Sequence, residues 1–179
     1  MEIEIRSRIN NLDNLLEEIE KLNILKKNEE RQIDTYFKHI NDITRKMVIR
    51  VREIMGKQSI LTFKGASPVE SDDTMWADFD TPIEKPEVLK SLLLSNGYEL
   101  VCIIDKHRQS FEHNGFEINI DNIKELGSFI EIEKQGESEE RKQAELEIVS
   151  LLKKLGINEN DIIKKGYVPL MLEKINTKY

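Results

Sequence analysis

The stretch Glu2-Ile3-Glu4-Ile5-Arg6 opens the chain and alternates strictly between charged and apolar side chains. Successive side chains of a β-strand point to opposite faces of the sheet, so residues two apart share a face. A strand over residues 1–9 therefore presents two carboxylates and a guanidinium on one face and isoleucines on the other. Such a strand needs an apolar partner on one side only.

Four later stretches repeat this pattern. They are Ile49-Arg50-Val51-Arg52, Asp78-Phe79-Asp80, Lys106-His107-Arg108 and Ile130-Glu131-Ile132-Glu133. Antiparallel sheets often expose one polar face to water, so each stretch taken alone indicates no more than a solvated face. Lysine and glutamate are poor strand formers, however. Their recurrence in pairs inside apolar runs favours a common surface on which carboxylates and cations collect.

The composition is that of a globular, heavily charged protein. Of its 179 residues, 39% are apolar and 34% are charged, and the net charge is −7. This length predicts a single domain over residues 1–179, and the negative charge argues against nucleic acid as the main ligand. The one cysteine, Cys102, lies in an apolar run and indicates a buried thiol. The acidic amino terminus and the lack of an apolar run of membrane-spanning length predict a cytoplasmic protein without a membrane partner.

Periodicity predicts an α+β fold. Strands are expected over residues 1–9, 32–39, 47–54, 60–64, 74–83, 98–109, 116–120 and 129–133, and helices over 12–22, 86–96 and 138–155, with one or two short helices in 158–174. Asn114-Gly115 predicts a hairpin turn between residues 110–113 and 116–120. Residues 26–30 are expected to form a loop. Short connections favour antiparallel pairing, and about eight strands can close into a barrel. Because the helices need apolar partners, we expect an eight-stranded antiparallel tunnel with a charged lumen and helices packed outside.

Such a lumen has the side chains to bind a metal ion and phosphate together. Carboxylate oxygens are the ligands that Mg²⁺ and Mn²⁺ prefer, and Arg and Lys bind phosphate oxygens. The candidate metal ligands are Glu2, Glu4, Asp121, Glu131 and Glu133, with Asp78 and Asp80 as further acids of the lumen. The candidate triphosphate-binding residues are Arg6, Arg50, Arg52, Lys64, Lys106 and Arg108. Together these groups can stabilise the charge on a transferring phosphoryl group.

The same motifs occur in an order that is typical of one family. The opening stretch is similar to an ExExK signature, and the run from Asp121 to Glu133 is similar to an Asp-x-Val, Leu-Gly-x-Phe, Glu-Ile-Glu sequence. Between them, residues 32–37, 50–52, 61–65 and 106–108 match further strands in order. Through these motifs the chain resembles the CYTH superfamily, the triphosphate tunnel metalloenzymes.

The resemblance implies a metal-dependent enzyme that acts on a small triphosphate: ATP, tripolyphosphate or thiamine triphosphate. It implies Mg²⁺ or Mn²⁺ as cofactor, the metal and phosphate roles given above, and catalytic roles for Lys64, Arg6 and Tyr36. The segment from Gly166 to Met171 is similar to the end of the cyclase-like subgroup. A class IV adenylyl cyclase-like activity, from ATP to cyclic AMP and pyrophosphate, is therefore the preferred function, and a homodimer is an open alternative to a monomer.

Two positions depart from the family pattern. Arg6 stands where the signature has lysine and cannot serve as a base. Trp76 stands where arginine is expected, ahead of the two shortened acids Asp78 and Asp80. These departures leave two other functions open: hydrolysis of tripolyphosphate or thiamine triphosphate, and binding of polyphosphate or nucleotide without turnover. For Tyr167 itself, the favoured interpretation is a packed core residue.

Overall fold

The computed structural model describes residues 2–41, 47–66 and 76–176, without the side chains at positions 2, 64–66, 76–78 and 138. The strands are β1 (Glu2–Arg8), β2 (Leu25–His39), β3 (Met47–Ile54), β4 (Ser59–Ala66), β5 (Trp76–Ile83), β6 (Tyr98–His113), β7 (Phe116–Ile123), β8 (Gly127–Gln135) and β9 (Ile162–Ile163). The α-helices are α1 (Leu12–Lys21), α2 (Pro86–Ser95), α3 (Arg141–Lys154) and α4 (Tyr167–Asn176), with short 3₁₀ turns at Ser138–Glu140 and Glu159–Asp161.

The described strands belong to one sheet with the order β5-β4-β3-β2-β6-β7-β8-β1-β9. Neighbouring strands with a defined register are antiparallel, which confirms the predicted α+β architecture. Two details differ from the prediction. The described part of the chain has nine strands, and their order runs from β5 to β9 without closing into a barrel. The additional strand, β9, has only two residues and pairs with β1, so it leaves no periodic signal in the sequence.

The chain divides into two compact units. Unit 1 comprises Met1–Glu30 and Lys106–Tyr179, and unit 2 comprises Arg31–Asp105. The chain passes from one unit to the other within the long strands β2 and β6. The two units are described separately below.

The strands of unit 1 have one apolar and one charged face. The register pairs Ile5 of β1 with Ile132 of β8, and Ile132 with Ile118 of β7, so the isoleucines meet on one face of the sheet. Ile118, Ile130 and Ile132 are fully buried. Since burying one such side chain contributes roughly 1.5–3 kcal/mol, this face stabilises unit 1 by several kcal/mol.

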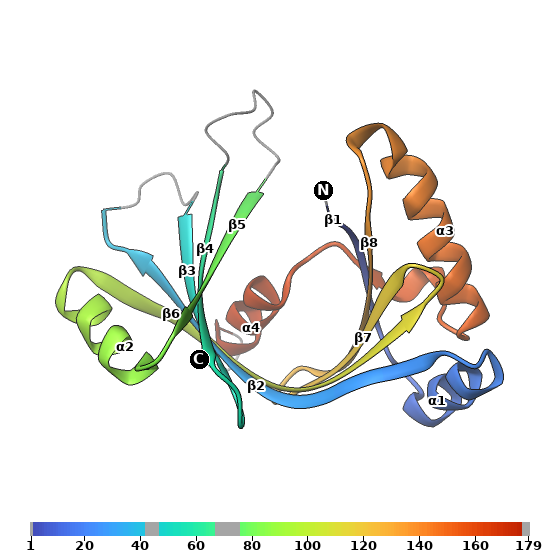
Figure 1. The fold of residues 1–179 in the computed structure, drawn as a ribbon, viewed down its shortest axis with the longest axis horizontal. Coiled ribbons are helices and arrows are strands. Elements are labelled where there is room, and N and C mark those ends of the chain that lie inside the picture. Colours follow the sequence, from blue (N-terminus) through green and yellow to red (C-terminus); the bar gives the residue numbers. More distant parts are fainter. Residues whose placement is uncertain (1, 42–46, 67–75, 177–179) are drawn as a thin grey trace. The chain divides into compact units, whose positions relative to one another are not determined.

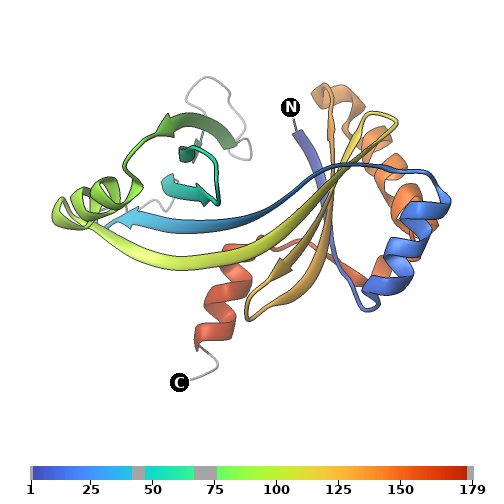
Figure 2. The same ribbon diagram turned by 60° about the horizontal axis from the view of Figure 1, so that its bottom comes forward.

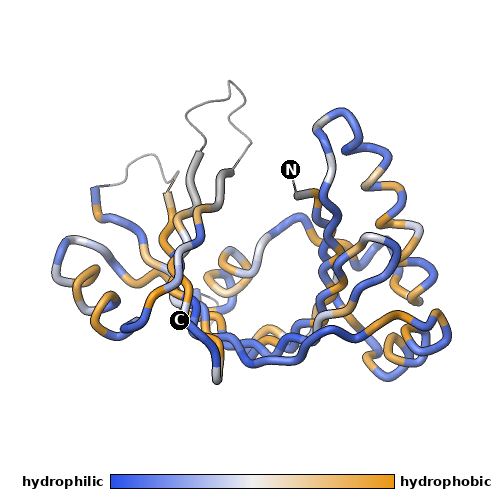
Figure 3. The backbone as a smooth tube through the Cα atoms, in the orientation of Figure 1, coloured by the Kyte–Doolittle hydropathy of each residue, from blue (hydrophilic) through white to orange (hydrophobic). Residues whose placement is uncertain are grey.

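Helices α1 and α3 cover the apolar face (Figures 1 and 2). Asn11 caps α1 because its side chain accepts a hydrogen bond from the backbone N–H of Asn14 at 3.0 Å. Leu15 and Ile19, one turn apart, are buried, as are four residues of α3: Ala144, Ile148, Leu151 and Leu152. Figure 3 shows hydrophobic and hydrophilic segments alternating along both helices. The predicted helices over 12–22 and 138–155 are confirmed, with a 3₁₀ turn over the first three residues of the second.

Strand β2 begins earlier than predicted, because residues 26–30 form a strand and not a loop. Charge pairs of unit 1 explain this extension. The Lys27 ammonium lies 2.6 Å from the Glu112 carboxylate, and His107 Nε2 lies 3.2 Å from Glu29. Pairs of opposite charge between strands offset the low strand propensity of these residues. The predicted hairpin at Asn114-Gly115 is confirmed: residues 110–113 continue β6 without a break as far as this turn, where both φ angles are positive.

Unit 2 contains the predicted hairpin, formed by β3 and β4, and adds β5 to its edge. Its apolar core contains Phe37, Ile49 and Val51, against which Leu89 and Leu93 of α2 pack. Pro86 stands at the first helical position, where its missing N–H is not needed, and the helix ends before Asn96. The predicted helix over 86–96 is therefore confirmed.

Helix α4 lies on the other face of the unit 1 sheet. Figures 1 and 2 show α3 and α4 on opposite sides of β8. Tyr167 and Met171 of α4 are buried, and the Tyr167 ring packs edge-on against Phe129, with 5.3 Å between the ring centroids. None of the described helices is long and apolar enough to cross a membrane.

Candidate functional site

The charged face of unit 1 is built by strand register. Glu4 is the Cα partner of Glu133, and Arg6 is the partner of Glu131. Asn119 of β7 stands next to Glu131, and Arg108 of β6 stands next to Asp121. Because alternate residues share a face, the charged residues of four adjacent strands meet there: Glu4, Arg6, Glu131, Glu133, Glu117, Asp121, Arg108 and Lys106.

Glu131 lies at the centre of this face. Its side chain is only 5% exposed and contacts two guanidinium groups. The Arg6 Nε donates to Glu131 Oε1 at 2.6 Å, and Arg108 Nη2 donates to Oε2. Arg6 also donates to Glu4, whose side chain is 31% exposed. One buried carboxylate therefore fixes two arginines that come from strands far apart in the sequence.

Asp121 is a second centre, and it is fully buried. Arg108 binds it through two nitrogens, Nε to Oδ1 at 2.7 Å and Nη2 to Oδ2 at 2.6 Å. The Lys106 ammonium donates to Oδ2 at 3.1 Å, and the Tyr167 hydroxyl donates to the same oxygen at 3.0 Å. Arg108 bridges the two centres, so these contacts form one network, which we call the ion-pair cluster: Glu4, Arg6, Lys106, Arg108, Asp121 and Glu131.

The ion-pair cluster keeps Asp121 and Glu131 ionised although both are buried. Burial alone raises the pKa of Asp121, but the hydrogen bond from Arg108 and the charge of Lys106 outweigh it and lower the pKa to about 2. Burial also raises the pKa of Glu131, and the charges of Arg108 and Arg6 reverse that effect and lower it. With three cations and three carboxylates, the cluster is balanced in charge.

Unit 2 has a charged face of its own. The Arg52 guanidinium binds Asp34 through two hydrogen bonds of 2.7 Å, and Asp34 is buried. Arg50 donates to the hydroxyl of Thr62 at 2.8 Å, and its Nη2 lies 3.8 Å from Asp80. Both arginines of the predicted Arg-x-Arg pair therefore stand on one face of β3 with fixed side chains.

Tyr36 belongs to the same unit and is buried. Burial and the charge of Asp34 raise the pKa of its hydroxyl to about 12, against the lowering effect of Arg50 and Arg52. Tyr36 therefore keeps its proton at neutral pH and can donate a hydrogen bond, but it does not act there as a base.

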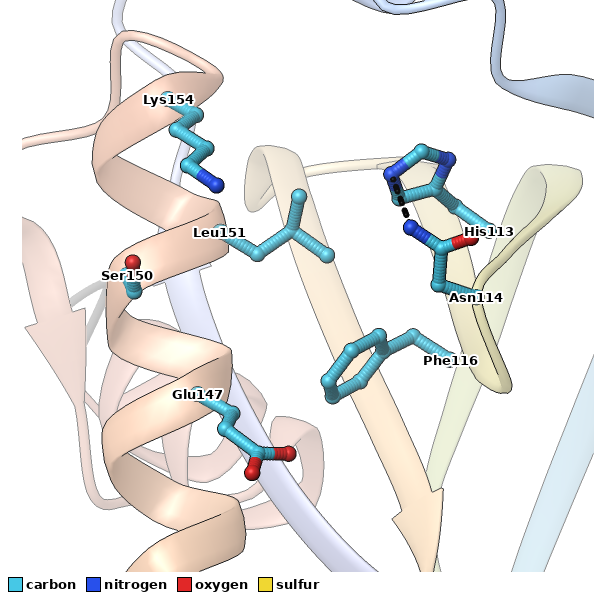
Figure 4. A pocket seen from close by; sticks show the side chains of 7 residues that line it. All are labelled: His113, Asn114, Phe116, Glu147, Ser150, Leu151 and Lys154. Carbon is cyan, nitrogen blue, oxygen red and sulfur yellow. Dashed lines mark hydrogen bonds between the residues drawn. The ribbon is translucent and has the colours of Figure 1, made fainter.

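A separate pocket of about 230 Å³ lies between α3 and the turn that joins β6 to β7 (Figure 4). Phe116 and Leu151 contribute apolar side chains to it, and Lys154, Glu147 and His113 contribute polar ones. Phe116 and α3 belong to the apolar side of the unit 1 sheet. The pocket therefore lies on the face opposite to the ion-pair cluster and is not part of the candidate site.

The order of these strands and charges is matched by a known family. The family model of the CYTH domain matches residues 1–167. The chain belongs to the CYTH domain family. CYTH proteins form the triphosphate tunnel enzyme family and are generally metal-dependent, so membership indicates an enzyme that acts on triphosphates.

Relatives of the chain carry names that agree with this membership. A protein of Methanocaldococcus jannaschii named "Putative adenylate cyclase MJ0240" is 27% identical over 173 residues, covering 95% of this chain and 98% of the relative. The solved PH1012 protein of Pyrococcus horikoshii OT3 has 23% identity and a TM-score of 0.79, covering 95% and 99% of the two chains. The solved HpAC1 of Hippeastrum, described as a putative adenylyl cyclase with a dominant triphosphatase activity, has 18% identity and a TM-score of 0.64, covering 93% and 91%. The two structural likenesses establish a shared fold.

The structure brings most of the predicted unit 1 residues of the CYTH site together. Arg6, Lys106, Arg108, Asp121 and Glu131 are in direct contact in the ion-pair cluster, and Glu4 joins them through Arg6. Glu133 stands beside Glu4 in the β1–β8 register. The backbones of Glu2, Lys64 and Asp78 lie in β1, β4 and β5, and their side chains lie outside the described part of the structure. Asp80 lies near Arg50 in unit 2.

The metal ligands of a CYTH enzyme can be compared with the carboxylates present. Glu4, Glu131 and Glu133 supply the hard oxygen donors that Mg²⁺ and Mn²⁺ require, and they lie on one face of adjacent strands. In residues 2–41, 47–66 and 76–176, no three His, Cys, Asp or Glu side chains are arranged as metal ligands. The oxygen donors of these three residues fit a divalent cation in kind. In the structure, however, the buried carboxylate of Glu131 is paired with Arg6 and Arg108.

Three residues that contact the charged side chains of the two units were missed in the sequence analysis. Asp34 occupies an alternate position in the strand over 32–39, so its place on the charged face was predictable from the period. Thr62 carries no charge, and its partnership with Arg50 depends on strand register. Tyr167 was interpreted as a core residue; it is buried, but its hydroxyl and ring contact the ion-pair cluster.

Proposed function

We propose that this CYTH protein is a class IV adenylyl cyclase-like enzyme, which converts ATP to cyclic AMP and pyrophosphate. Support for this comes from the family and from the name of the Methanocaldococcus jannaschii relative. The segment from Gly166 to Met171, which is similar to the end of the cyclase-like subgroup, supports it as well. The observation that carries the proposal is the convergence of Arg6, Lys106 and Arg108 in one charge-balanced ion-pair cluster.

These three cations fit the recognition of phosphate. A guanidinium can bind two oxygens of a phosphate at once, and an ammonium binds as a compact charge. Arg6 stays protonated: burial opposes its charge, but Glu131 and Glu4 raise its pKa further above the ordinary value. The cations are held before a ligand arrives, which limits the entropy lost when they bind one. In the same family scheme, Arg50, Arg52 and Lys64 are proposed to bind phosphate as well.

Glu4, Glu131 and Glu133 are the described side chains that would hold Mg²⁺ or Mn²⁺, together with Glu2. A bound divalent cation supplies charge neutralisation and orients phosphate oxygens. We do not include Asp121 among these metal ligands, because it is fully buried and three side chains donate hydrogen bonds to it.

The proposed cyclisation needs positioning more than a strong side-chain base. The 3′-hydroxyl oxygen of ATP attacks the α-phosphorus and releases its proton to solvent water, the bond from that phosphorus to the bridging oxygen breaks, and pyrophosphate leaves with the negative charge. Arg6 and Tyr36 retain their protons at neutral pH. We therefore assign them hydrogen bonding and charge stabilisation in the transition state, with Lys64 as a third group of this kind.

Hydrolysis of a triphosphate is the second candidate. The observation that favours it is the structural relative HpAC1, a named cyclase with a dominant triphosphatase activity. The same cationic face can bind tripolyphosphate or thiamine triphosphate, because it recognises the phosphates and not the base. In this reaction water attacks the terminal phosphorus and the remaining diphosphate leaves.

The deciding experiment is incubation of the protein with ATP, tripolyphosphate and thiamine triphosphate, each with Mg²⁺ and with Mn²⁺, followed by identification of the products. Cyclic AMP with pyrophosphate in equal amounts supports the cyclase. Inorganic phosphate without cyclic AMP supports the triphosphatase. Binding of all three compounds without any product would replace both enzymes by a binding module.

A further inference from the structure

Tyr167 connects the carboxy-terminal helix to the ion-pair cluster. Its hydroxyl donates to Asp121 Oδ2 at 3.0 Å. Its ring centroid lies 4.3 Å from the guanidinium carbon of Arg6 and 5.4 Å from the Lys106 ammonium. The side chain is buried, so water does not compete for these contacts. One residue therefore touches an acid and two cations of the cluster at the same time.

The Tyr167 hydroxyl is the donor of this hydrogen bond. Asp121 Oδ2, its acceptor, also accepts hydrogen bonds from Arg108 and Lys106. The carboxylate therefore serves Tyr167 and both cations as their common acceptor.

Asp121 is held from three sides. Arg108 occupies Oδ1 and shares Oδ2 with Lys106 and Tyr167. A carboxylate with two oxygens and about four acceptor sites is nearly saturated by these donors. If the hydroxyl of Tyr167 is removed, the carboxylate loses the contact that restrains Oδ2 from the side of α4. The Arg108 fork and the Lys106 ammonium then lose part of their fixed orientation.

The segment just before Tyr167 acts on the same cation. Arg6 Nη1 donates to the backbone carbonyl of Lys165 at 3.1 Å. The ring of Tyr167 covers the face of the Arg6 guanidinium, and a cation over an aromatic face is attracted by the charge distribution of the ring. Arg6 is therefore restrained in its plane by a carbonyl and across its plane by a ring.

We propose that Tyr167 is a positioning residue: through Asp121 and its own ring it holds Arg108, Lys106 and Arg6 in the orientation that the charged face needs. In this assignment Asp121 anchors cations and is not a ligand of a metal ion. The consequence for triphosphate affinity rests on the proposed function, whereas the positioning of the arginines does not.

The first test measures the arginines without any ligand. In ¹⁵N NMR spectra, the Nε–H of Arg108 and of Arg6 should exchange slowly with water in the wild type, because each donates to a buried carboxylate. Tyr167→Phe should accelerate this exchange about 10-fold, since one charge-assisted hydrogen bond is lost. The matched control is Tyr98→Phe, which removes a hydroxyl beside the apolar core of unit 2. Unchanged exchange in Tyr167→Phe would overturn the proposal, whatever happens to ligand binding.

The second test measures the affinity for tripolyphosphate by calorimetry. Tyr167→Phe should weaken it about 10-fold, while Tyr98→Phe should leave it at the wild-type value. In an Asp121→Asn background the same removal of the hydroxyl should have no further effect, because its acceptor has lost the charge. An effect of equal size in both backgrounds would contradict positioning through Asp121. Faster arginine exchange with unaltered affinity would support the positioning and overturn its consequence for triphosphate binding. If the wild type does not bind tripolyphosphate, the proposed function fails, and the exchange measurement alone decides the role of Tyr167.

Discussion

Replacement of Asp121 by asparagine tests how much the ion-pair cluster contributes to folding. Asn keeps the shape of the side chain and removes its charge, so Lys106 and Arg108 remain buried beside a neutral amide. Removing one partner of a buried ion pair typically destabilises a protein by about 3–5 kcal/mol, because the remaining charge is desolvated without compensation. We expect a loss of about 3 kcal/mol in the free energy of unfolding at neutral pH.

The pH dependence gives an independent magnitude. The pKa of Asp121 is lowered from 3.8 to about 2 in the folded protein. Because the folded-state pKa is the lower one, this stabilisation is present above pH ~4 and is lost as the pH falls through about 2. At 1.36 kcal/mol for each pKa unit, the carboxylate contributes about 2 kcal/mol that disappears in this window.

Urea denaturation at several pH values between about 2 and 7 measures both quantities. Between pH ~5 and pH ~2, the free energy of unfolding should fall by about 2 kcal/mol more in the wild type than in Asp121→Asn. This difference separates the effect of Asp121 from that of Glu131 and the other acids. The control Asp13→Asn changes an exposed carboxylate of α1 and should follow the wild type within a few tenths of a kcal/mol. Equal pH slopes for the wild type and Asp121→Asn would refute the assignment of Asp121 as an ionised anchor.

Three further predictions concern other parts of the molecule. Glu133→Gln should abolish metal-dependent turnover while the far-UV circular dichroism stays unchanged, and full activity would remove Glu133 from the metal site. Arg52→Ala should weaken tripolyphosphate binding by more than about 1.5 kcal/mol in calorimetry, the size of a charge-assisted contact; an unaltered affinity would take Arg52 out of the phosphate site. Ile148→Ala should lower the free energy of unfolding by about 2–5 kcal/mol because it opens a cavity under α3. Leu146→Ala is its control, because the Leu146 side chain of the same helix is 66% exposed. Equal losses in the two variants would show that α3 does not pack as described.

The sequence predicted the elements with a strong period and missed those that depend on pairing. Helices over 12–22 and 86–96 were found because their apolar residues repeat every three to four positions and because Pro86 marks a start. Residues 26–30 have no apolar period, and their strand forms because Lys27 and Glu29 find partners on β6. The strand Ile162–Ile163 is too short to show any period.

The site follows the same division. Alternation alone placed Arg6, Glu131 and Arg108 on one face, and the structure puts them in contact. Which acid pairs with which cation could not be read from alternation, since it depends on the register between strands far apart in the chain. The contacts of Tyr167 also depend on where α4 packs, which the helical pattern does not specify.

The equal numbers of opposite charges in the ion-pair cluster have a consequence for how a ligand enters. Each buried charge of the cluster has a counterion within the protein itself, so neutralising this interior requires neither phosphate nor a divalent ion. A triphosphate that arrives together with such an ion brings the same two signs of charge. The triphosphate can then bind the cations of the existing pairs while the divalent ion binds the carboxylates. The interior stays close to neutral throughout this exchange.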